Sequence, residues 1–342
     1  MRSNITAITY AFLAEVFYAI NVPCSKILLA HIPPVFMAGL LYIGAGIGVG
    51  AMYLFHFKHE AKSERLSKSD LPFTIGMVFL DIVAPIFLMF GIKMGSASSA
   101  SLLGNFEIVA TALIALLLFK EKVSTRLWAA IAFITSSSII LSFEGSESFS
   151  FSLGSLFVLA ATICWGLENN CTRRISEKST YQIVTIKGFG SGLGAVAVAL
   201  PTGEKLTEWN YVPLVLLLGF VAYGLSIFTY IRAQKYLGAA KTSAYYAFAP
   251  FIGSFFAFVF LGETLSIQYA IALVIMLCGT IFVIYDTLVK SHVHKHSHTF
   301  THTHNGITHT HTIIHSHIHN HLMNEENHGH HHSKKELEAA FK

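Results

Sequence analysis

Phe119-Lys120-Glu121-Lys122-Val123-Ser124 closes one long apolar run and opens the next, and 142 positions later Leu261-Gly262-Glu263-Thr264-Leu265-Ser266 does the same. A second pair of segments agrees with the first, because Tyr18-Ala19 through Cys24-Ser25-Lys26 returns as Trp165-Gly166 through Cys171-Thr172-Arg173. If each half of the chain holds five membrane spans, an odd number, the two copies are inserted upside down relative to each other. That arrangement is typical of transporters that work by alternating access.

The composition indicates a membrane protein. Of 342 residues, 53% are hydrophobic and 12% are charged, against roughly 25% charged residues in an ordinary soluble domain. A bilayer core asks for runs of about 20 apolar residues. Ten such runs are present, at 5–27, 34–57, 71–93, 97–119, 126–143, 152–172, 181–200, 210–231, 239–261 and 266–288.

We therefore predict an all-α membrane protein of ten transmembrane helices, arranged as two inverted five-helix repeats. The first repeat covers 1–145 and the second 146–290, and a disordered histidine-rich tail follows at 291–342. The first run contains Glu15 and no small-residue cleavage pattern follows it, so we expect it to be retained as a span. Four cysteines fall inside the runs without a Cys-x-x-Cys spacing, which predicts neither a disulfide framework nor a zinc site.

Lysine and arginine in short loops stay on the cytoplasmic side. With the amino terminus inside, the inner loops would hold most of these residues, among them Lys58, Lys62, Arg65, Lys68, Arg173, Arg174, Lys178, Arg232 and Lys235. Lys205 is the one clear case in an outer loop. We expect a multi-pass protein of the cell (inner) membrane with both termini in the cytoplasm. The net charge of +4 reflects this topology, and no nucleic-acid partner is expected.

Short motifs then carry a family resemblance. In the second half they are Gly154-Ser155-Leu156, Cys164-Trp165-Gly166, Arg173-Arg174, Leu237-Gly238-Ala239-Ala240 and Ala249-Pro250-Phe251. Their order and spacing, echoed in the first half, resemble the EamA family of ten-span carriers in the drug/metabolite transporter superfamily, over residues 5–288. The resemblance implies export of a small metabolite, commonly an amino acid or a related compound, through a central cavity open alternately to each side. The chain departs from the family at Ile108, where a proline is usual, at Tyr18, where a tryptophan is usual, and in its tail.

Four acidic residues lie well inside the apolar runs: Glu15, Asp81, Glu107 and Glu168. A charge at the bilayer centre costs at least about 2.5–3.5 kcal/mol by insertion scales, so such groups rarely persist without a partner or a function. One interpretation is that they are silent, hydrogen-bonded helix contacts. The other is that they converge with Asn105 and Asn169 on a cavity between the halves and exchange protons there. Glu107 is our first choice for coupling, and Asp81 and Glu15 are the next.

Other intramembrane side chains have two interpretations each. Lys187 is close enough to the inner surface to reach it along its own stem, or it points inward and pairs with Glu168 or with a substrate carboxylate. Trp165, Tyr18, Tyr245 and Tyr246 either pack as anchors or line a cavity for an amphiphilic ligand. The chain holds no His-Glu-x-x-His and no Gly-x-Ser-x-Gly motif, and we expect it not to be an enzyme.

The tail holds sixteen of the nineteen histidines, mostly in His-x-His repeats. Neutral imidazole binds Zn²⁺, Ni²⁺ and Co²⁺, and loosely spaced histidines suit labile multi-site binding. The predicted ligands are His292, His294, His296, His298, His302, His304, His309, His311, His315, His317, His319 and His321. No cofactor is expected to be required. The tail either feeds or senses metal, or is a solvated appendage that binds metal incidentally, or senses pH because imidazole titrates near pH 6.5.

The function that these patterns favour is secondary transport, namely proton-coupled export of a small amino-acid-like metabolite across the lipid bilayer. An exporter of divalent zinc, nickel or cobalt that uses the tail is the main alternative. A metal sensor that transports nothing is a third class, and a homodimer is left open.

Overall fold

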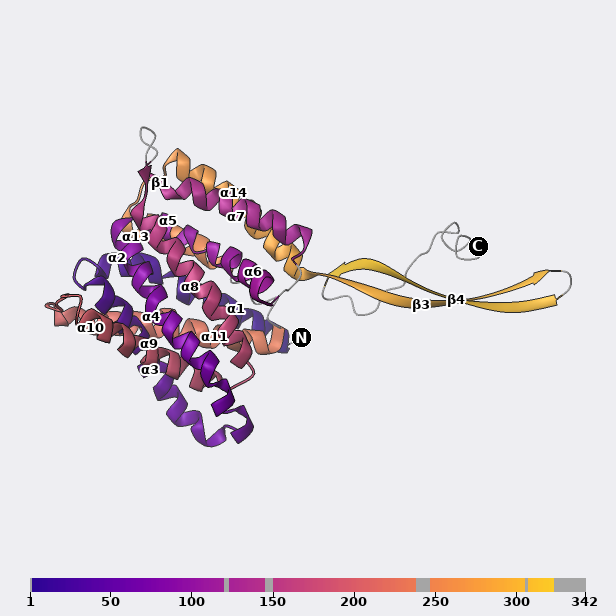
Figure 1. The fold of residues 1–342 in the computed structure, drawn as a ribbon, viewed down its shortest axis with the longest axis horizontal. Coiled ribbons are helices and arrows are strands. Elements are labelled where there is room, and N and C mark those ends of the chain that lie inside the picture. The colour runs from indigo at the N-terminus through magenta and orange to yellow at the C-terminus, as the bar shows by residue number, and fades with distance from the viewer. Residues whose placement is uncertain (1, 120–122, 145–149, 238–246, 305–306, 323–342) are drawn as a thin grey trace. The chain divides into compact units, whose positions relative to one another are not determined.

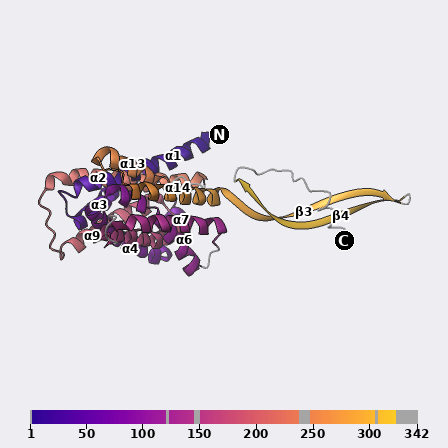
Figure 2. The same cartoon turned by 90° about the horizontal axis from the view of Figure 1, so that it is seen from above.

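The computed structural model describes residues 2–119, 123–144, 150–237, 247–304 and 307–322. It divides into two compact units, Met1–Ile284 and Tyr285–Lys342. The first unit is a bundle of helices that run side by side, as Figures 1 and 2 show from two directions. Each unit is described by itself below.

In the first half, helices α1 (Arg2–Ala19) and α2 (Asn21–Leu28) follow each other across the first apolar run. Helices α3 (Pro34–His56) and α4 (Leu71–Met94) come next, joined by three short 3₁₀ turns between Phe57 and Asp70. The fourth run is made of α5 (Ala97–Leu103) and α6 (Phe106–Phe119), and α7 (Thr125–Ser142) closes the half. Two-residue strands β1 (Phe143–Glu144) and β2 (Ser150–Phe151) then pair antiparallel.

The second half begins with α8 (Leu153–Ile175) and α9 (Thr180–Ala199). A 3₁₀ turn (Trp209–Tyr211) leads into α10 (Val212–Gly219) and α11 (Ser226–Leu237), which are separated by a π-helical segment, η5 (Phe220–Leu225). Helix α13 (Ala249–Leu261) ends at Gly262, whose positive φ of 62° suits glycine at the end of a helix. Helix α14 (Ile267–Leu288) follows, and the first unit ends within it, at Ile284.

The bundle is all-α as predicted, apart from the two-residue strands β1 and β2, but the count of ten spans stays a prediction. Eight helical stretches among the described residues are long and apolar enough to cross a membrane. The two other expected spans correspond to α8 and α13. Helix α8 is 23 residues long but carries Glu168 and two arginines in its last turns, and α13 has 13 described residues.

The inversion of the two halves is visible in α3 and α9, the second helical run of each repeat, which pack against each other. The amide nitrogen of Val35, at the start of α3, donates to Glu204 Oε2 just beyond the end of α9, at 3.0 Å. Near the other end of α3, Tyr53 Oη accepts from Nε2 of Gln182 at the start of α9, at 2.8 Å. Since the start of one helix meets the end of the other, equivalent helices of the two copies run in opposite directions.

The second copy of the repeated segment, residues 261–266, caps a helix of the other half. Glu263 accepts hydrogen bonds from the amide nitrogens of Ala97 (2.7 Å) and Ser98 (3.0 Å) at the start of α5. Lys26 Nζ donates to the carbonyl oxygens of Ile92 (2.7 Å) and Gly95 (2.6 Å) at the end of α4. An anion at a helix start and a cation at a helix end both complement the helix dipole. The α4–α5 turn is therefore held by charges from two distant parts of the chain.

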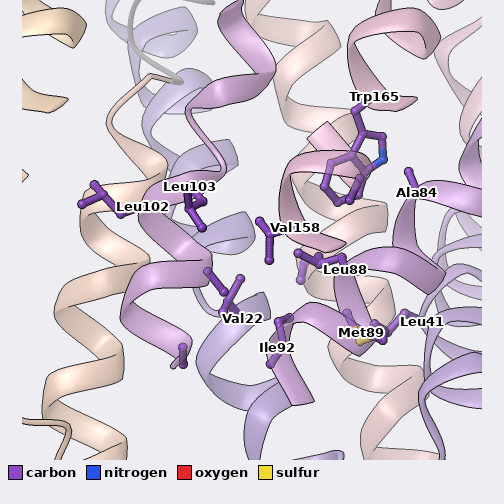
Figure 3. Close-up of a cluster of buried hydrophobic side chains, with 14 of the residues drawn as sticks. Val22, Leu41, Ala84, Leu88, Met89, Ile92, Leu102, Leu103, Val158 and Trp165 are labelled. Carbon is purple, nitrogen blue, oxygen red and sulfur yellow. The ribbon is translucent and has the colours of Figure 1, made fainter. Parts of the chain in front are cut away.

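The main core of the first unit lies between the two halves. Its buried side chains come from α2, α4, α5 and α8 among others, and include Val22, Leu88, Leu103, Val158 and Trp165. Figure 3 shows part of this cluster gathered between the helices. Burying such side chains removes apolar surface from water or lipid and brings the two halves into close packing.

The prediction of a wholly disordered tail is wrong for much of its length. Strands β3 (Val289–His304) and β4 (Ile307–Leu322) form an antiparallel hairpin, drawn as the long paired arrows in Figure 1. The physical reason is the alternation of histidine with threonine, valine and isoleucine, because β-branched residues at a period of two favour strands. Residues 323–342 lie outside the described part.

Candidate functional site

Three charged side chains from three helices meet inside the bundle. Lys187 Nζ, on α9, lies 3.1 Å from Asp81 Oδ2 on α4 and 3.0 Å from Glu168 Oε1 on α8. Their exposed fractions are 7% for Lys187, 0% for Asp81 and 2% for Glu168. We call Asp81, Lys187 and Glu168 the charged cluster. Lys187 therefore turns into the bundle and does not reach along its stem toward the surface.

Hydroxyl groups extend the charged cluster on two sides. Tyr42 on α3 donates from Oη to Asp81 Oδ1 at 2.9 Å, and the Thr172 hydroxyl, one turn along α8, donates to Glu168. The ring of Tyr42 lies 4.9 Å, centroid to centroid, from the ring of Tyr223. These groups hold the carboxylates in place, since a buried charge is tolerated only when its hydrogen-bonding capacity is met.

Tyr223 connects this region to the first helices of the chain. It lies in the π-helical segment η5, and its Oη accepts a hydrogen bond from Asn21 Nδ2 at 3.1 Å. Asn21 Oδ1 in turn accepts from Ser25 Oγ at 3.1 Å. Single π turns inside α-helices are frequent at functional positions, and here the π turn carries a tyrosine that faces both Tyr42 and Asn21.

Glu107 approaches the charged cluster from a fourth helix. It lies in the first turn of α6 and accepts a hydrogen bond from Asn169 Nδ2 at 2.6 Å. Asn169 follows Glu168 in the chain, and its amide also lies 3.4 Å from Thr111 Oγ1. The structure thus brings Glu107, Asn169, Glu168, Asp81 and Lys187 into one neighbourhood, although they come from four helices.

A small cavity lies between the halves. It measures about 20 Å³, enough space for about one water molecule. We call it the central cavity. Its walls include Tyr18 and Trp165, which hold equivalent positions in the two repeats, together with Gly104 and Pro250. Its size means that an amino acid fits only if the halves move apart.

Glu15 lies on the same helix face as residues that line the central cavity. Tyr18, Ala19 and Val22 of the first helices line the cavity, and Glu15 precedes them by three, four and seven residues, which places it on the same helix face. Its side chain is 4% exposed. Among the described residues no hydrogen bond or ion pair is found for its carboxyl group.

A larger pocket of about 220 Å³ adjoins the central cavity, and the two share Ala100 and Val158 in their walls. Its lining is rich in hydroxyl and amide groups, among them Ser99, Ser155 and Gln268. Under the predicted topology this pocket is at the outer ends of the helices, so we call it the outer pocket. Ala100 and Val158 therefore lie at the boundary between the outer pocket and the central cavity.

The remaining predicted site residues lie elsewhere. Asn105 turns away from the charged cluster, because its Nδ2 lies 3.4 Å from Thr280 Oγ1 on α14. Tyr245 and Tyr246 lie outside the described residues. The twelve predicted metal ligands of the tail fall on β3 and β4. In the described part of the chain, no three histidine, cysteine or acidic side chains gather as a metal ion would require.

Sequence reasoning missed Tyr42, Tyr223 and Asn21. Tyrosines in apolar runs resemble packing residues, so Tyr42 and Tyr223 gave no signal of their own. Asn21 did have a signal: when Tyr18 is aligned with Trp165 and Lys26 with Arg173, Asn21 stands where the second copy has Glu168. A polar side chain at the same position of both repeats indicates that a hydrogen-bonding group is needed at this position in each half.

The fold and the site together define a class of protein. A helical bundle built from two oppositely directed copies, with buried charges and a cavity between the copies, is the architecture of a membrane transporter. A family model identifies the kind of transporter: residues 5–143 and residues 152–285 each match the EamA-like transporter family. The chain belongs to this family, and its two matched segments coincide with the two repeats.

Similar proteins agree with the assignment to transporters. An uncharacterized transporter of Methanothermobacter thermautotrophicus is 26% identical over 296 residues, which cover 80% of this chain and 84% of that protein. The uncharacterized transporter YyaM of Bacillus subtilis is 22% identical and covers 66% of this chain and 76% of its own length. One solved crystal structure, 15% identical, has a TM-score of 0.61 and covers 84% of this chain and 97% of the other. At that identity the likeness concerns the fold.

Proposed function

We propose that this transporter exports a small amino-acid-like metabolite and couples the export to proton movement through the charged cluster. The observation that carries the proposal is the charge count: two carboxyl groups, Asp81 and Glu168, share one ammonium group, Lys187, in a buried site. A buried charge without a partner is strongly unfavourable. The cluster is electrically neutral when one of its carboxyl groups holds a proton.

The charge balance of the charged cluster links binding of a proton to binding of the substrate. Loss of the proton leaves one net negative charge among three helices, and this charge is compensated by water, by another proton or by a cationic group. The ammonium group of an amino-acid-like substrate is such a cation. Binding of the substrate and binding of the proton then compete, and competition of this kind is how an antiporter exchanges one for the other.

The central cavity supports a substrate with both polar and apolar parts. Tyr18 and Trp165 supply aromatic walls, which accept an apolar side chain and keep a polar edge. Glu15 supplies a carboxyl group on the same side as Tyr18, in a place where the described residues offer it no partner. We assign the substrate ammonium group to the charged cluster, Glu15 to the side of the central cavity, and Glu107, held by Asn169, to proton exchange with the charged cluster.

The test is flux in sealed proteoliposomes with a panel of labelled amino acids. Two assays are needed, counterflow at equal pH and uptake driven by a pH difference. Asp81→Asn, Glu168→Gln and Glu107→Gln are each compared with Glu177→Gln, a change at an exposed glutamate. We expect the three intramembrane variants to keep part of their counterflow and to lose most pH-driven accumulation, because exchange needs no net release of a proton. Full pH-driven accumulation in all three variants would contradict proton coupling.

The metal-export alternative has less support inside the bundle. Lys187 stands between the two carboxylates, and a fixed positive charge there disfavours a divalent cation. The same vesicles can be loaded with Zn²⁺, Ni²⁺ or Co²⁺, with the full chain and with a chain that ends after Lys290. Metal flux that falls sharply on truncation would favour metal export. A complete lack of flux for every substrate would favour a metal sensor.

A further inference from the structure

A serine in the wall of the central cavity has no hydrogen-bond partner. Ser101 lies in the last turn of α5 and is 5% exposed. Within the described part of the chain its Oγ atom meets neither a donor nor an acceptor. The Thr162 hydroxyl in the same walls, by contrast, donates to the carbonyl oxygen of Leu159 at 2.7 Å. A buried hydroxyl without a partner costs free energy, so Ser101 indicates a place for a ligand or a water molecule.

A backbone carbonyl group faces the same place. Ala19, the last residue of α1, lines the cavity together with Ser101. In a continuous helix its oxygen would accept from the amide nitrogen four residues later, but that residue is Pro23, which has no amide hydrogen. The Ala19 carbonyl oxygen therefore lacks its usual helical donor. Carbonyl groups freed where a membrane helix is broken commonly contribute to binding sites in transporters.

Gly253 on α13 borders both of these polar groups. A Cβ atom on Gly253 would lie 3.1 Å from the Ala19 carbonyl oxygen and 3.1 Å from the Ser101 Oγ atom. The two polar atoms thus border one point beside Gly253, which also lines the cavity. A glycine adds no side chain that would cover them. We call Ala19, Ser101 and Gly253 the polar spot.

The polar spot has the chemistry to bind a neutral group. The Ser101 hydroxyl can donate or accept a hydrogen bond, and the Ala19 carbonyl oxygen can only accept. A hydroxyl or carboxamide group both donates and accepts, so it can satisfy both partners at once. An anion is disfavoured, because the described residues that line the cavity carry no positive charge. The Glu15 carboxyl group, one helical turn before Ala19, adds to this effect.

We propose that the polar spot selects the substrate by binding a hydroxyl or carboxamide group on its side chain, with Ser101 as the specificity-determining residue. The inference rests on the proposed function for the class of substrate, but it does not depend on proton coupling. Glu168 of the charged cluster follows Trp165 of the cavity wall by three residues, nearly one turn of α8. The site assigned to the ammonium group therefore adjoins the cavity that receives the side chain.

The test compares amino acids of similar shape with and without such a group. Proteoliposomes with the full chain are assayed by counterflow at equal pH, using labelled threonine and valine as one pair and labelled asparagine and leucine as the other. For the parent chain we expect half-saturating concentrations about 10-fold lower for threonine than for valine and for asparagine than for leucine, because the polar spot supplies two hydrogen bonds.

Ser101→Ala removes the hydroxyl and should abolish this preference. We expect the half-saturating concentration of threonine to rise about 10-fold and that of valine to stay unchanged. Because the variant loses a buried group that has no partner, its unfolding temperature in detergent should be no lower than that of the parent. Ser98→Ala is the matched control. It makes the same change at another buried serine of α5 that is not part of the cavity walls, and it should keep the preference.

Gly253→Ala tests the polar spot from the opposite side. The added methyl group would lie against both polar atoms and exclude a hydroxyl group from them. We expect this variant to lose the preference for threonine although the Ser101 hydroxyl is still present. A Gly253→Ala variant that still prefers threonine about 10-fold would contradict the inference.

The remaining outcomes separate this inference from the proposed function. Equal half-saturating concentrations within both pairs for the parent, or an unchanged preference in Ser101→Ala, would overturn the inference and leave amino-acid export intact. So would a Ser101→Ala variant in which threonine and valine weaken equally, or one that unfolds at a clearly lower temperature, since the hydroxyl would then have a structural role. A parent chain with no flux of any amino acid would overturn the proposed function and this inference together.

Discussion

Lys187 is the single residue on which the buried charges depend. Replacing it by methionine leaves Asp81 and Glu168 without their shared cation inside the bundle. Breaking a buried ion pair by removing one partner costs about 3–5 kcal/mol. We therefore expect Lys187→Met to lower the unfolding temperature strongly in detergent, measured by differential scanning fluorimetry, and to abolish pH-driven flux.

A triple variant separates stability from function. Lys187→Met combined with Asp81→Asn and Glu168→Gln removes all three charges together, and replacement of a buried ion pair by neutral groups is often tolerated. We expect the triple variant to regain most of the lost unfolding temperature and to remain unable to couple flux to pH. A triple variant as unstable as Lys187→Met would show that the cluster is required for folding itself.

The sequence was sufficient to predict each acidic residue of the site as a candidate. It could not show which of these side chains lie close together in the fold. In an apolar span every helix face is hydrophobic, so periodicity does not report which way Asp81 or Asn105 points. Asp81 joined the cluster and Asn105 turned to Thr280, although both were polar residues in apolar runs. What decides between them is helix rotation, which tertiary packing sets.

At the scale of elements, α3 and α9 pack closely against each other across the two halves. A Cβ atom on Gly188 would lie 2.3 Å from the Gly46 nitrogen, whereas one on Gly50 would lie no nearer than 3.4 Å to any neighbour. We expect Gly188→Ala to destabilise the protein by about 1–3 kcal/mol or more through overpacking against backbone. Gly50→Ala, at another glycine of this pair of helices, is the matched control and should be near neutral in the same thermal measurement.

The cap on α5 leads to a second prediction about elements. Glu263→Gln removes the negative charge from the amide nitrogens of Ala97 and Ser98. Loss of a charged cap costs about 0.5–2 kcal/mol. The variant should unfold at a lower temperature than Glu177→Gln, which changes an exposed glutamate. Faster hydrogen exchange confined to the amides at the start of α5 would place the effect at this cap, and unchanged exchange there would contradict it.

Element boundaries in the helical unit followed the apolar runs, because length and hydrophobicity define a span. The π turn at η5 and the break between α5 and α6 could not be predicted from the composition of these segments. The hairpin of the tail could have been predicted: its period of two and its Asn-Gly dipeptide are both in the sequence, and the high content of polar residues led us to expect disorder.

At the scale of the whole molecule, the orientation in the membrane is open to direct measurement. In a background with the four cysteines replaced by alanine, Lys205→Cys should react with a membrane-impermeant maleimide in intact cells. Lys62→Cys should react only after permeabilisation, because positive loops are retained inside. The opposite labelling pattern would reverse the topology, with both termini then outside.

The inverted architecture is the feature that the sequence predicted best, because it needs only two repeated segments and an odd number of spans between them. The contacts between α3 and α9 agree with it. The small size of the central cavity could not be predicted from the sequence, because it depends on how the two halves pack against each other.

Asn21 and Glu168 occupy matching places in the two copies, and only one of them carries a charge. If the copies had the same side chains, a two-fold rotation about an axis in the membrane plane would convert the form open to one side into the form open to the other, and the two would have equal free energy. The unequal pair removes this degeneracy. We therefore expect the empty carrier to favour one of these two forms, and a single substitution that makes the two positions alike, Asn21→Glu or Glu168→Asn, to shift that preference.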